Sequence, residues 1–122
     1  MKRALVAVAM LLGGCSTIPT PTPISPKNGV TFDHFPRATE LTWSAVPGAA
    51  SYSVEIDCFH CCDVGKWCTE TTKPRMAASR IEGTSYRFNW VGANLGRWRV
   101  WAVGSDGKES AKSEWQDFLY NR

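Results

Sequence analysis

The sequence predicts an all-β protein, a seven-stranded antiparallel β-sandwich that carries a Cys-rich insert. Three observations support this prediction. Short runs in which apolar and polar residues alternate recur along the chain, turn residues separate them at regular intervals, and no segment has the periodicity of a long helix. With 122 residues, the chain has room for one such domain.

The stretch from Leu41 to Ile56 organises the predicted sheets. Residues 40–44 form one strand, Pro47 and Gly48 supply a turn, and residues 51–58 form the next strand. Apolar and polar side chains alternate along 51–58, so one face of this strand is apolar. Further strands are predicted at residues 30–32, 70–72, 84–90, 97–103 and 114–120, and a short helical turn at residues 74–79.

The N-terminus has the features of an export signal. Lys2 and Arg3 form a basic start, and residues 4–12 form an apolar run that is too short to span a bilayer as a helix. Removal of these two cations leaves 12 of the 14 cations against 11 anions in the mature chain. No basic tract remains, so we expect no nucleic-acid partner.

The apolar run ends in Leu12-Gly13-Gly14-Cys15, which resembles the lipobox of bacterial lipoproteins. This resemblance implies that residues 1–14 are a lipoprotein signal peptide and that Cys15 is lipidated after cleavage. It also implies a lipid-anchored place in the bacterial cell envelope, with Ser16 favouring the outer membrane. The alternative is an ordinary secretory signal followed by an incidental Cys.

Residues 15–25 join the lipidated Cys to a stretch in which three prolines alternate with Thr or Ile. This composition favours an extended polyproline-like tether without a core, a spacer of about 25–30 Å at ~3.1 Å per residue. The folded domain is therefore predicted to cover residues 26–122.

Two segments resemble strands of the fibronectin type III family. Leu41-Thr42-Trp43, Val46-Pro47-Gly48-Ala49 and Tyr52-Ser53-Val54 look like its strands B and C. The run Arg97-Trp98-Arg99-Val100-Trp101-Ala102-Val103, the Asp106-Gly107 turn, and then Ser110, Ser113, Trp115 and Phe118 look like its strands F and G. The resemblance covers residues 26–122 and implies a fibronectin type III, immunoglobulin-like sandwich in which the Cys-rich insert follows strand C.

The resemblance also implies which side chains face the core. The inward set is Trp43, Tyr52, Val54, Ile56, Trp98, Val100, Ala102 and Phe118. The same register places a second set on the outer face of the sheet: Ser53, Glu55, Asp57, Arg97, Arg99 and Trp101. Gly96 stands where the family has a Tyr that closes a corner, and we expect Trp90 to fill the space which that Tyr leaves.

Four cysteines, Cys58, Cys61, Cys62 and Cys68, follow the strand at 51–58. An exported chain meets an oxidising compartment, so an even number of Cys predicts two disulfides. Three pairings exist, and the one that joins Cys58 to Cys68 leaves the adjacent Cys61 and Cys62 as a strained pair or as free thiols. The sequence does not choose between the other two. Alternatives are a zinc or soft-metal site with His60, or thiol exchange at Cys58 and Cys61, although we expect no cofactor.

Two groups of residues are candidates for a binding surface. On the outer face, the guanidinium groups of Arg97 and Arg99 can stack on the indole rings of Trp101 and Trp115. This cluster resembles the Trp–Arg ladder of cytokine-receptor type III domains, and it is either structural or a surface for a protein or a sugar.

The second candidate lies in the insert, where a disulfide-braced loop would present Phe59, His60 and Trp67. We expect Trp67 to be exposed at the tip. Trp67→Ala should then spare folding and abolish binding of a partner.

No catalytic constellation is present, so we predict that the protein is not an enzyme. His34 and His60 lie in different loops, and no nucleophile elbow or Gly-rich phosphate loop appears. The predicted function is an interaction module that is attached to a membrane by its N-terminal lipid and binds an unidentified envelope protein. Alternatives are a carbohydrate-binding module, a metal- or thiol-handling lipoprotein, and an inhibitor or exclusion factor that blocks an envelope protein.

Overall fold

The computed structural model of the protein describes residues 17–122. The predicted signal peptide and the lipidation of Cys15 lie outside the described residues. Within residues 17–122 the secondary structure comprises β2 (Pro23–Ser25), β3 (Val30–Phe32), β4 (Ala38–Trp43), β5 (Ser51–Cys58), the 3₁₀ helix η2 (Cys68–Glu70), β6 (Met76–Ile81), β7 (Ser85–Asn89), β8 (Leu95–Val103) and β9 (Gln116–Tyr120). None of the helices in this part of the chain is long and apolar enough to cross a membrane.

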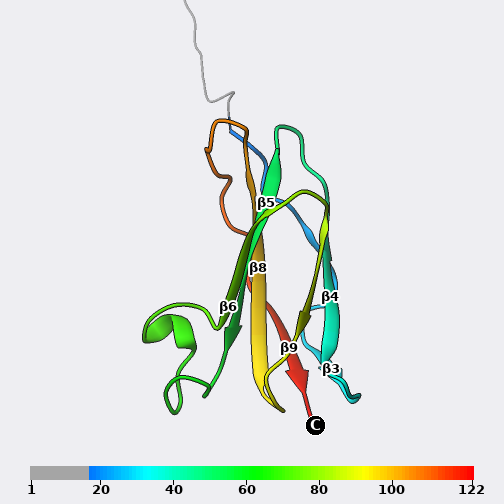
Figure 1. The fold of residues 1–122 in the computed structure, drawn as a ribbon, viewed down its shortest axis with the longest axis vertical. Coiled ribbons are helices and arrows are strands. Elements are labelled where there is room, and N and C mark those ends of the chain that lie inside the picture. The colour runs from blue at the N-terminus through cyan, green and yellow to red at the C-terminus, as the bar shows by residue number, and fades with distance from the viewer. Residues whose placement is uncertain (1–16) are drawn as a thin grey trace, which may run out of the picture.

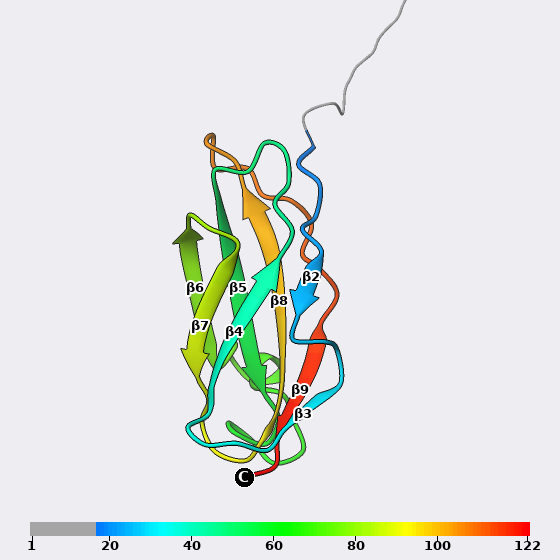
Figure 2. The same ribbon diagram turned by 90° about the vertical axis from the view of Figure 1, so that its right-hand side faces the viewer.

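The strands form two sheets that face each other across one core (Figures 1 and 2). One sheet has the order β2-β4-β7, and the other has the order β3-β9-β8-β5-β6. Neighbouring strands are antiparallel except β3 and β9, which pair in parallel. The predicted antiparallel β-sandwich with a Cys-rich insert after the strand at 51–58 is confirmed, although residues 17–122 form eight strands where seven were predicted and one pair is parallel.

Two segments between β5 and β7 differ from the prediction. Residues 74–79 were expected to form a helical turn, but Met76–Ile81 form the edge strand β6 and pair with β5. The two alanines of this segment favour a helix by propensity, and pairing with a neighbouring strand overrides that preference. Residues 70–72 were expected to form a strand, but Glu70 is the last residue of the 3₁₀ helix η2, and residues 71 and 72 form a turn and a bend.

The structure also differs from the predicted tether. Ile18 packs against the core, Pro21 is fully buried, and β2 pairs with β4. The backbone N–H of Thr22 donates to Ser44 Oγ at 2.9 Å. A Pro residue has no backbone N–H to donate to a neighbouring strand. An edge strand pairs on one side only, so a Pro-rich segment can join a sheet there. The chain is therefore held on the sandwich from about residue 18, well before the predicted domain start at residue 26.

The core agrees with the predicted inward set. The eight predicted residues are at most 5% exposed: Trp43, Tyr52, Val54, Ile56, Trp98, Val100, Ala102 and Phe118. Burial of each large side chain contributes roughly 1.5–3 kcal/mol relative to its exposed state. Alternation along β5 and β8 therefore predicted correctly which face of these strands packs against the opposite sheet.

Trp90 fills the space beside Gly96, as expected. It is 5% exposed, and its indole N–H donates to the carbonyl oxygen of Asn94 at 3.1 Å. A Cβ on Gly96 would lie 2.7 Å from Trp90 Cζ2 and closer still to the ring of Phe118. The lack of a side chain at Gly96 therefore allows two aromatic rings to meet over the backbone of β8.

Candidate binding surface

The Cys-rich insert, residues 59–75, leaves the sandwich where β5 ends (Figure 1). Figure 1 shows it at the end of the molecule opposite the point at which the described chain begins. We call the end with the insert the distal end, because it is the end away from the start of the described chain. The opposite end, where Ile18 lies beside Gly48 and Gly104, is the proximal end.

Two disulfides brace the insert. Cys58 is bonded to Cys61, and Cys62 to Cys68. This is one of the two pairings that avoid a bond between neighbouring cysteines, and it closes two short loops in series. Because all four sulfurs are paired, this form of the protein has no free thiolate in the insert for a metal.

A buried carboxylate attaches the insert to the sheet. Asp57, the last outward-facing residue of β5, is fully buried and accepts hydrogen bonds from the hydroxyl of Thr69 at 2.6 Å and from its backbone N–H at 3.2 Å. On its other side, Arg97 Nη2 lies 3.2 Å from Asp57 Oδ2 and 3.1 Å from Thr69 Oγ1. Thr69 belongs to η2, so this network fixes the base of the insert against β5 and β8.

The outer face of β5, β8 and β9 carries a row of stacked rings and cations. Arg97 Cζ lies 4.1 Å from the ring centre of Trp67 and 4.2 Å from that of Trp115, and Arg99 Cζ lies 4.1 Å from Trp115. Farther along, Lys112 Nζ lies 4.4 Å from the ring centre of Trp101. These residues, Trp67, Arg97, Trp115, Arg99, Lys112 and Trp101, form what we call the Trp–cation ladder.

Acidic partners balance the cations of the ladder. Glu55 accepts a hydrogen bond from Arg99 Nε at 2.8 Å, and its other oxygen lies 3.4 Å from Lys112 Nζ. The register of β5 against β8 explains these pairs, because Glu55 lies opposite Arg99 and Asp57 lies opposite Arg97. The predicted cluster of Arg97, Arg99, Trp101 and Trp115 therefore shares one face, as the family resemblance implied.

Two serines position the part of the ladder that precedes β9. Ser110 Oγ accepts from the N–H of Ala102 at 2.9 Å, and Ser113 Oγ accepts from the N–H of Val100 at 3.0 Å. The backbone N–H groups of the same serines donate to the carbonyls of Ala102 and Val100 at 2.9 Å. These side chains substitute for strand pairing beside β8, and they hold Lys112 and Trp115 over the outer face.

The structure places Trp67 in the ladder and not at the exposed tip of the insert. Its ring is half-buried, stacks on Arg97, and meets the ring of Phe59 at a centroid distance of 5.3 Å. The expectation that Trp67→Ala spares folding does not fit this packing. Of the predicted insert residues, Phe59 is also half-buried, and His60 is exposed.

The exposed apolar residue of the insert is Val64, which sequence reasoning missed. Its side chain is 82% exposed, in a turn between Asp63 and Lys66 whose charges lie 3.8 Å apart. Asp63 Oδ1 accepts a hydrogen bond from the N–H of Val64 at 2.9 Å, which orders the turn. A single Val among polar residues has no periodicity, so no sequence signal marks it.

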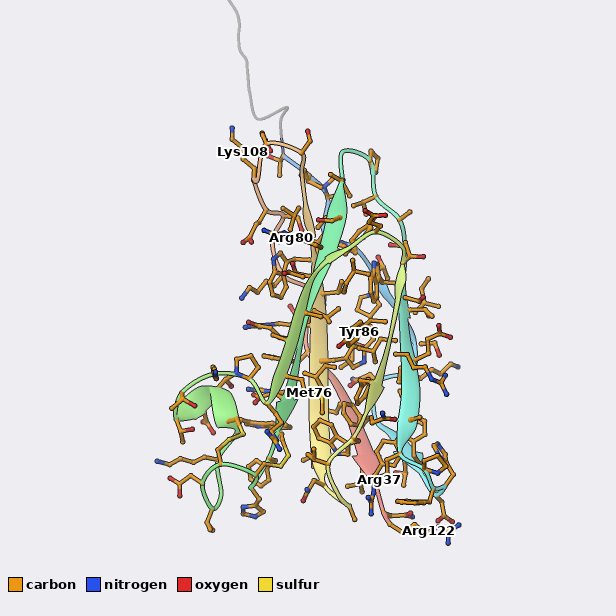
Figure 3. All side chains as sticks on the ribbon, in the orientation of Figure 1. Arg37, Met76, Arg80, Tyr86, Lys108 and Arg122 are labelled. Carbon is orange, nitrogen blue, oxygen red and sulfur yellow. A yellow bond between two sulfur atoms is a disulfide. The ribbon has the colours of Figure 1, made fainter. Side chains whose placement is uncertain are left out.

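Phe35, which is 70% exposed, is a second exposed apolar side chain toward the distal end. It lies in the loop between β3 and β4, with Arg37 Cζ 5.1 Å from its ring centre. Figure 3 labels Arg37 and Arg122 at this end and Lys108 at the proximal end. The distal end therefore presents Phe35 and Val64 from two separate loops.

A hollow of about 320 Å³ lies on the outer face beside the edge strand β6. Its lining comprises Ser53, Val54, Glu55, Ala77, Ala78, Ser79, Trp101 and Glu109. Trp101 is only 9% exposed, and its indole N–H is buried without a hydrogen-bond partner within residues 17–122. Trp101 therefore lies on the outer face, as predicted, but it is buried there.

Comparison with known proteins identifies the fold. No protein family matches the sequence, and no curated protein matches it. Among solved structures, a Fn3-like protein from Clostridium thermocellum is 25% identical, with a TM-score of 0.58 over 87% of this chain and 96% of that chain. The twitchin kinase region from C. elegans is 18% identical, with a TM-score of 0.54 over 87% of this chain but 17% of that chain. The predicted fibronectin type III-like sandwich is thus confirmed as the fold.

Proposed function

We propose that this protein is a lipid-anchored lipoprotein of the bacterial envelope whose fibronectin type III-like domain binds another envelope protein through the tip of its insert. The tip is the turn between Asp63 and Lys66 that carries Val64. One observation supports this proposal above the others. The insert is fixed to the sheet at its base and braced by two disulfides, yet it presents Val64 to solvent at 82% exposure.

The rigidity of the insert favours binding. A loop that is already ordered loses less conformational entropy when it meets a partner, so more of the contact energy contributes to affinity. The Asp57–Thr69–Arg97 network and both disulfides supply this order before any partner arrives. Binding residues on loops that a rigid scaffold positions are a common arrangement in proteins.

The location in the envelope rests on two features of the chain. The sequence that ends in Cys15 resembles a lipobox, and Ser16 after it is compatible with the outer membrane. The two disulfides are consistent with an oxidising compartment, since structural disulfides persist outside the cytosol.

Intact-mass spectrometry of membrane-extracted protein tests lipidation, and Cys15→Ser should move the protein to the soluble fraction.

The change Val64→Glu should weaken capture of the partner by about tenfold or more, because a carboxylate at the centre of an apolar contact must lose its water. The measurement is quantitative pulldown of the full-length lipoprotein from its native membranes. Ser85→Glu is the matched control, since Ser85 is exposed on the sheet opposite the ladder. Equal partner yields for the wild type and Val64→Glu would contradict the proposal.

A glycan is the second candidate partner, and the hollow beside β6 is the observation that favours it. Ser53, Ser79 and Glu109, which carry hydroxyl and carboxylate groups, line this hollow together with Trp101. The ladder rings are less suited to sugar stacking, because two guanidinium groups lie within 4.2 Å of the centre of Trp115. A glycan array with the wild type and Ser53→Leu separates this role from protein docking.

Two other functions remain as alternatives, metal or thiol chemistry and inhibition of an envelope protein, and each can be tested separately. Metal or thiol chemistry needs the disulfides Cys58–Cys61 and Cys62–Cys68 to be reduced, and zinc content measured with and without reductant tests it. An inhibitor or exclusion factor would use the same docking surface, and activity of the captured partner distinguishes it from a passive binder.

A further inference from the structure

We infer that the proximal end of the sandwich rests directly on lipid headgroups, so that the domain stands end-on at the membrane with its insert pointing away. The inference rests on the proposed lipidation of Cys15. It goes beyond that proposal because it assigns a membrane-facing surface to the folded domain.

The first step is the attachment of residues 18–25 to the sandwich. Ile18 packs beside Gly48 and Gly104, and Pro21 is fully buried. The N–H of Thr22 donates to Ser44 Oγ, and the N–H of Ser44 donates to the carbonyl of Thr22, both at 2.9 Å. The chain therefore behaves as part of the domain from Ile18 onward and does not act as a free spacer.

The second step is the length of chain that remains. Three peptide steps join Cys15 to Ile18, and a fully extended chain covers at most ~11 Å over that span. A lipid on Cys15 fixes that residue at the membrane surface. Gly48 and Gly104, which flank Ile18, are then held within the same ~11 Å of the headgroups.

The third step is the chemistry of the proximal end. The exposed residues of the two loops beside Ile18 are small or polar: Ala45, Pro47, Gly48, Ala50, Ser105, Asp106, Gly107, Lys108 and Glu109. The large apolar side chains that are exposed within residues 17–122, Ile24, Phe35 and Val64, lie elsewhere. Such a surface suits contact with polar headgroups and lacks the apolar groups that insert between acyl chains.

The orientation has a consequence for the partner. β5 starts next to the proximal end and runs eight residues to the insert, a length of ~26 Å at about 3.3 Å per residue. Figure 2 shows β5 and β8 running the length of the sandwich between the two ends. The partner must therefore approach Val64 from outside the headgroup layer.

The test uses the purified lipidated chain in liposomes that contain a headgroup-labelled quencher. One sample carries a fluorescent amino acid in place of Lys108, and another carries it in place of Val64. We expect several-fold stronger quenching at position 108. Insertion of a flexible Gly/Ser linker of about 12 residues after Ser16, with a reach of ~20 Å, should remove most of this difference.

Three outcomes would overturn the inference, and intact mass separates the first two. Equal quenching at positions 108 and 64 in protein whose mass includes the lipid refutes the orientation and leaves the anchor in place. Absence of lipid from the mass of the mature protein refutes both the orientation and the proposed anchoring. A difference in quenching that the linker does not reduce would also refute it, because the short reach from Cys15 would then not cause the orientation.

Discussion

Replacing Asp57 with Ala is expected to destabilise the domain by about 3–5 kcal/mol, because the change leaves the charge of Arg97 largely buried and without its partner. Asp57 is fully buried, and the side chain of Arg97 is only 19% exposed. The change also removes the acceptor for the N–H and the hydroxyl of Thr69. Guanidinium unfolding followed by Trp fluorescence measures the loss.

Asp63→Ala is the control for this prediction. Asp63 lies in the insert and also faces a cation, but both side chains of its pair with Lys66 are 55% exposed. An exposed ion pair contributes roughly 0–1 kcal/mol, so this change should leave the unfolding midpoint almost unchanged. If Asp57→Ala costs no more than Asp63→Ala, the buried network does not hold the insert to the sheet.

Gly96→Ala is expected to destabilise the domain by about 1–3 kcal/mol or more, because the new methyl group overpacks a filled part of the core. A Cβ there would lie 2.7 Å from the ring of Trp90 and would also overlap the ring of Phe118. Both rings are at most 5% exposed and have little space into which to move. Thermal unfolding by circular dichroism measures the effect.

Gly83→Ala makes the same chemical change where there is space. Nothing lies within 4 Å of a Cβ built on Gly83, and its φ is outside the left-handed region. The substitution should be neutral or slightly stabilising, since Ala restricts the unfolded chain more than Gly does. A melting temperature for Gly96→Ala equal to that of Gly83→Ala would show that Trp90 and Phe118 do not fill the space above Gly96.

The sequence was sufficient for strands that are buried on one face. Alternation along 51–58 and 97–103 indicates a sheet with one apolar side, so it identified the inward residues and the outer cluster around Arg97 and Arg99. The edge strands β2 and β6 were missed because their own residues carry little pattern. Pairing with β4 and β5 places them in the sheets, and that pairing is not visible within the segments.

The insert could be predicted only in part for a related reason. The presence of four Cys predicted two disulfides, but the remaining pairings close loops of similar length, so entropy does not select among them. The path of the loop between Cys58 and Cys68 is irregular. Its contacts with the sheet, Thr69 on Asp57 and Trp67 on Arg97, therefore leave no periodic signal, and neither does the exposure of Val64.

Site-specific photocrosslinking in cells tests the central claim most directly, that the tip of the insert is the docking surface. A photoreactive amino acid replaces Val64 in the full-length chain, and a second sample carries it in place of Ser85 as the control. The proposed function predicts a discrete adduct with one envelope protein from position 64 and none from position 85. The absence of an adduct from position 64, or the same adduct from both positions, would contradict it.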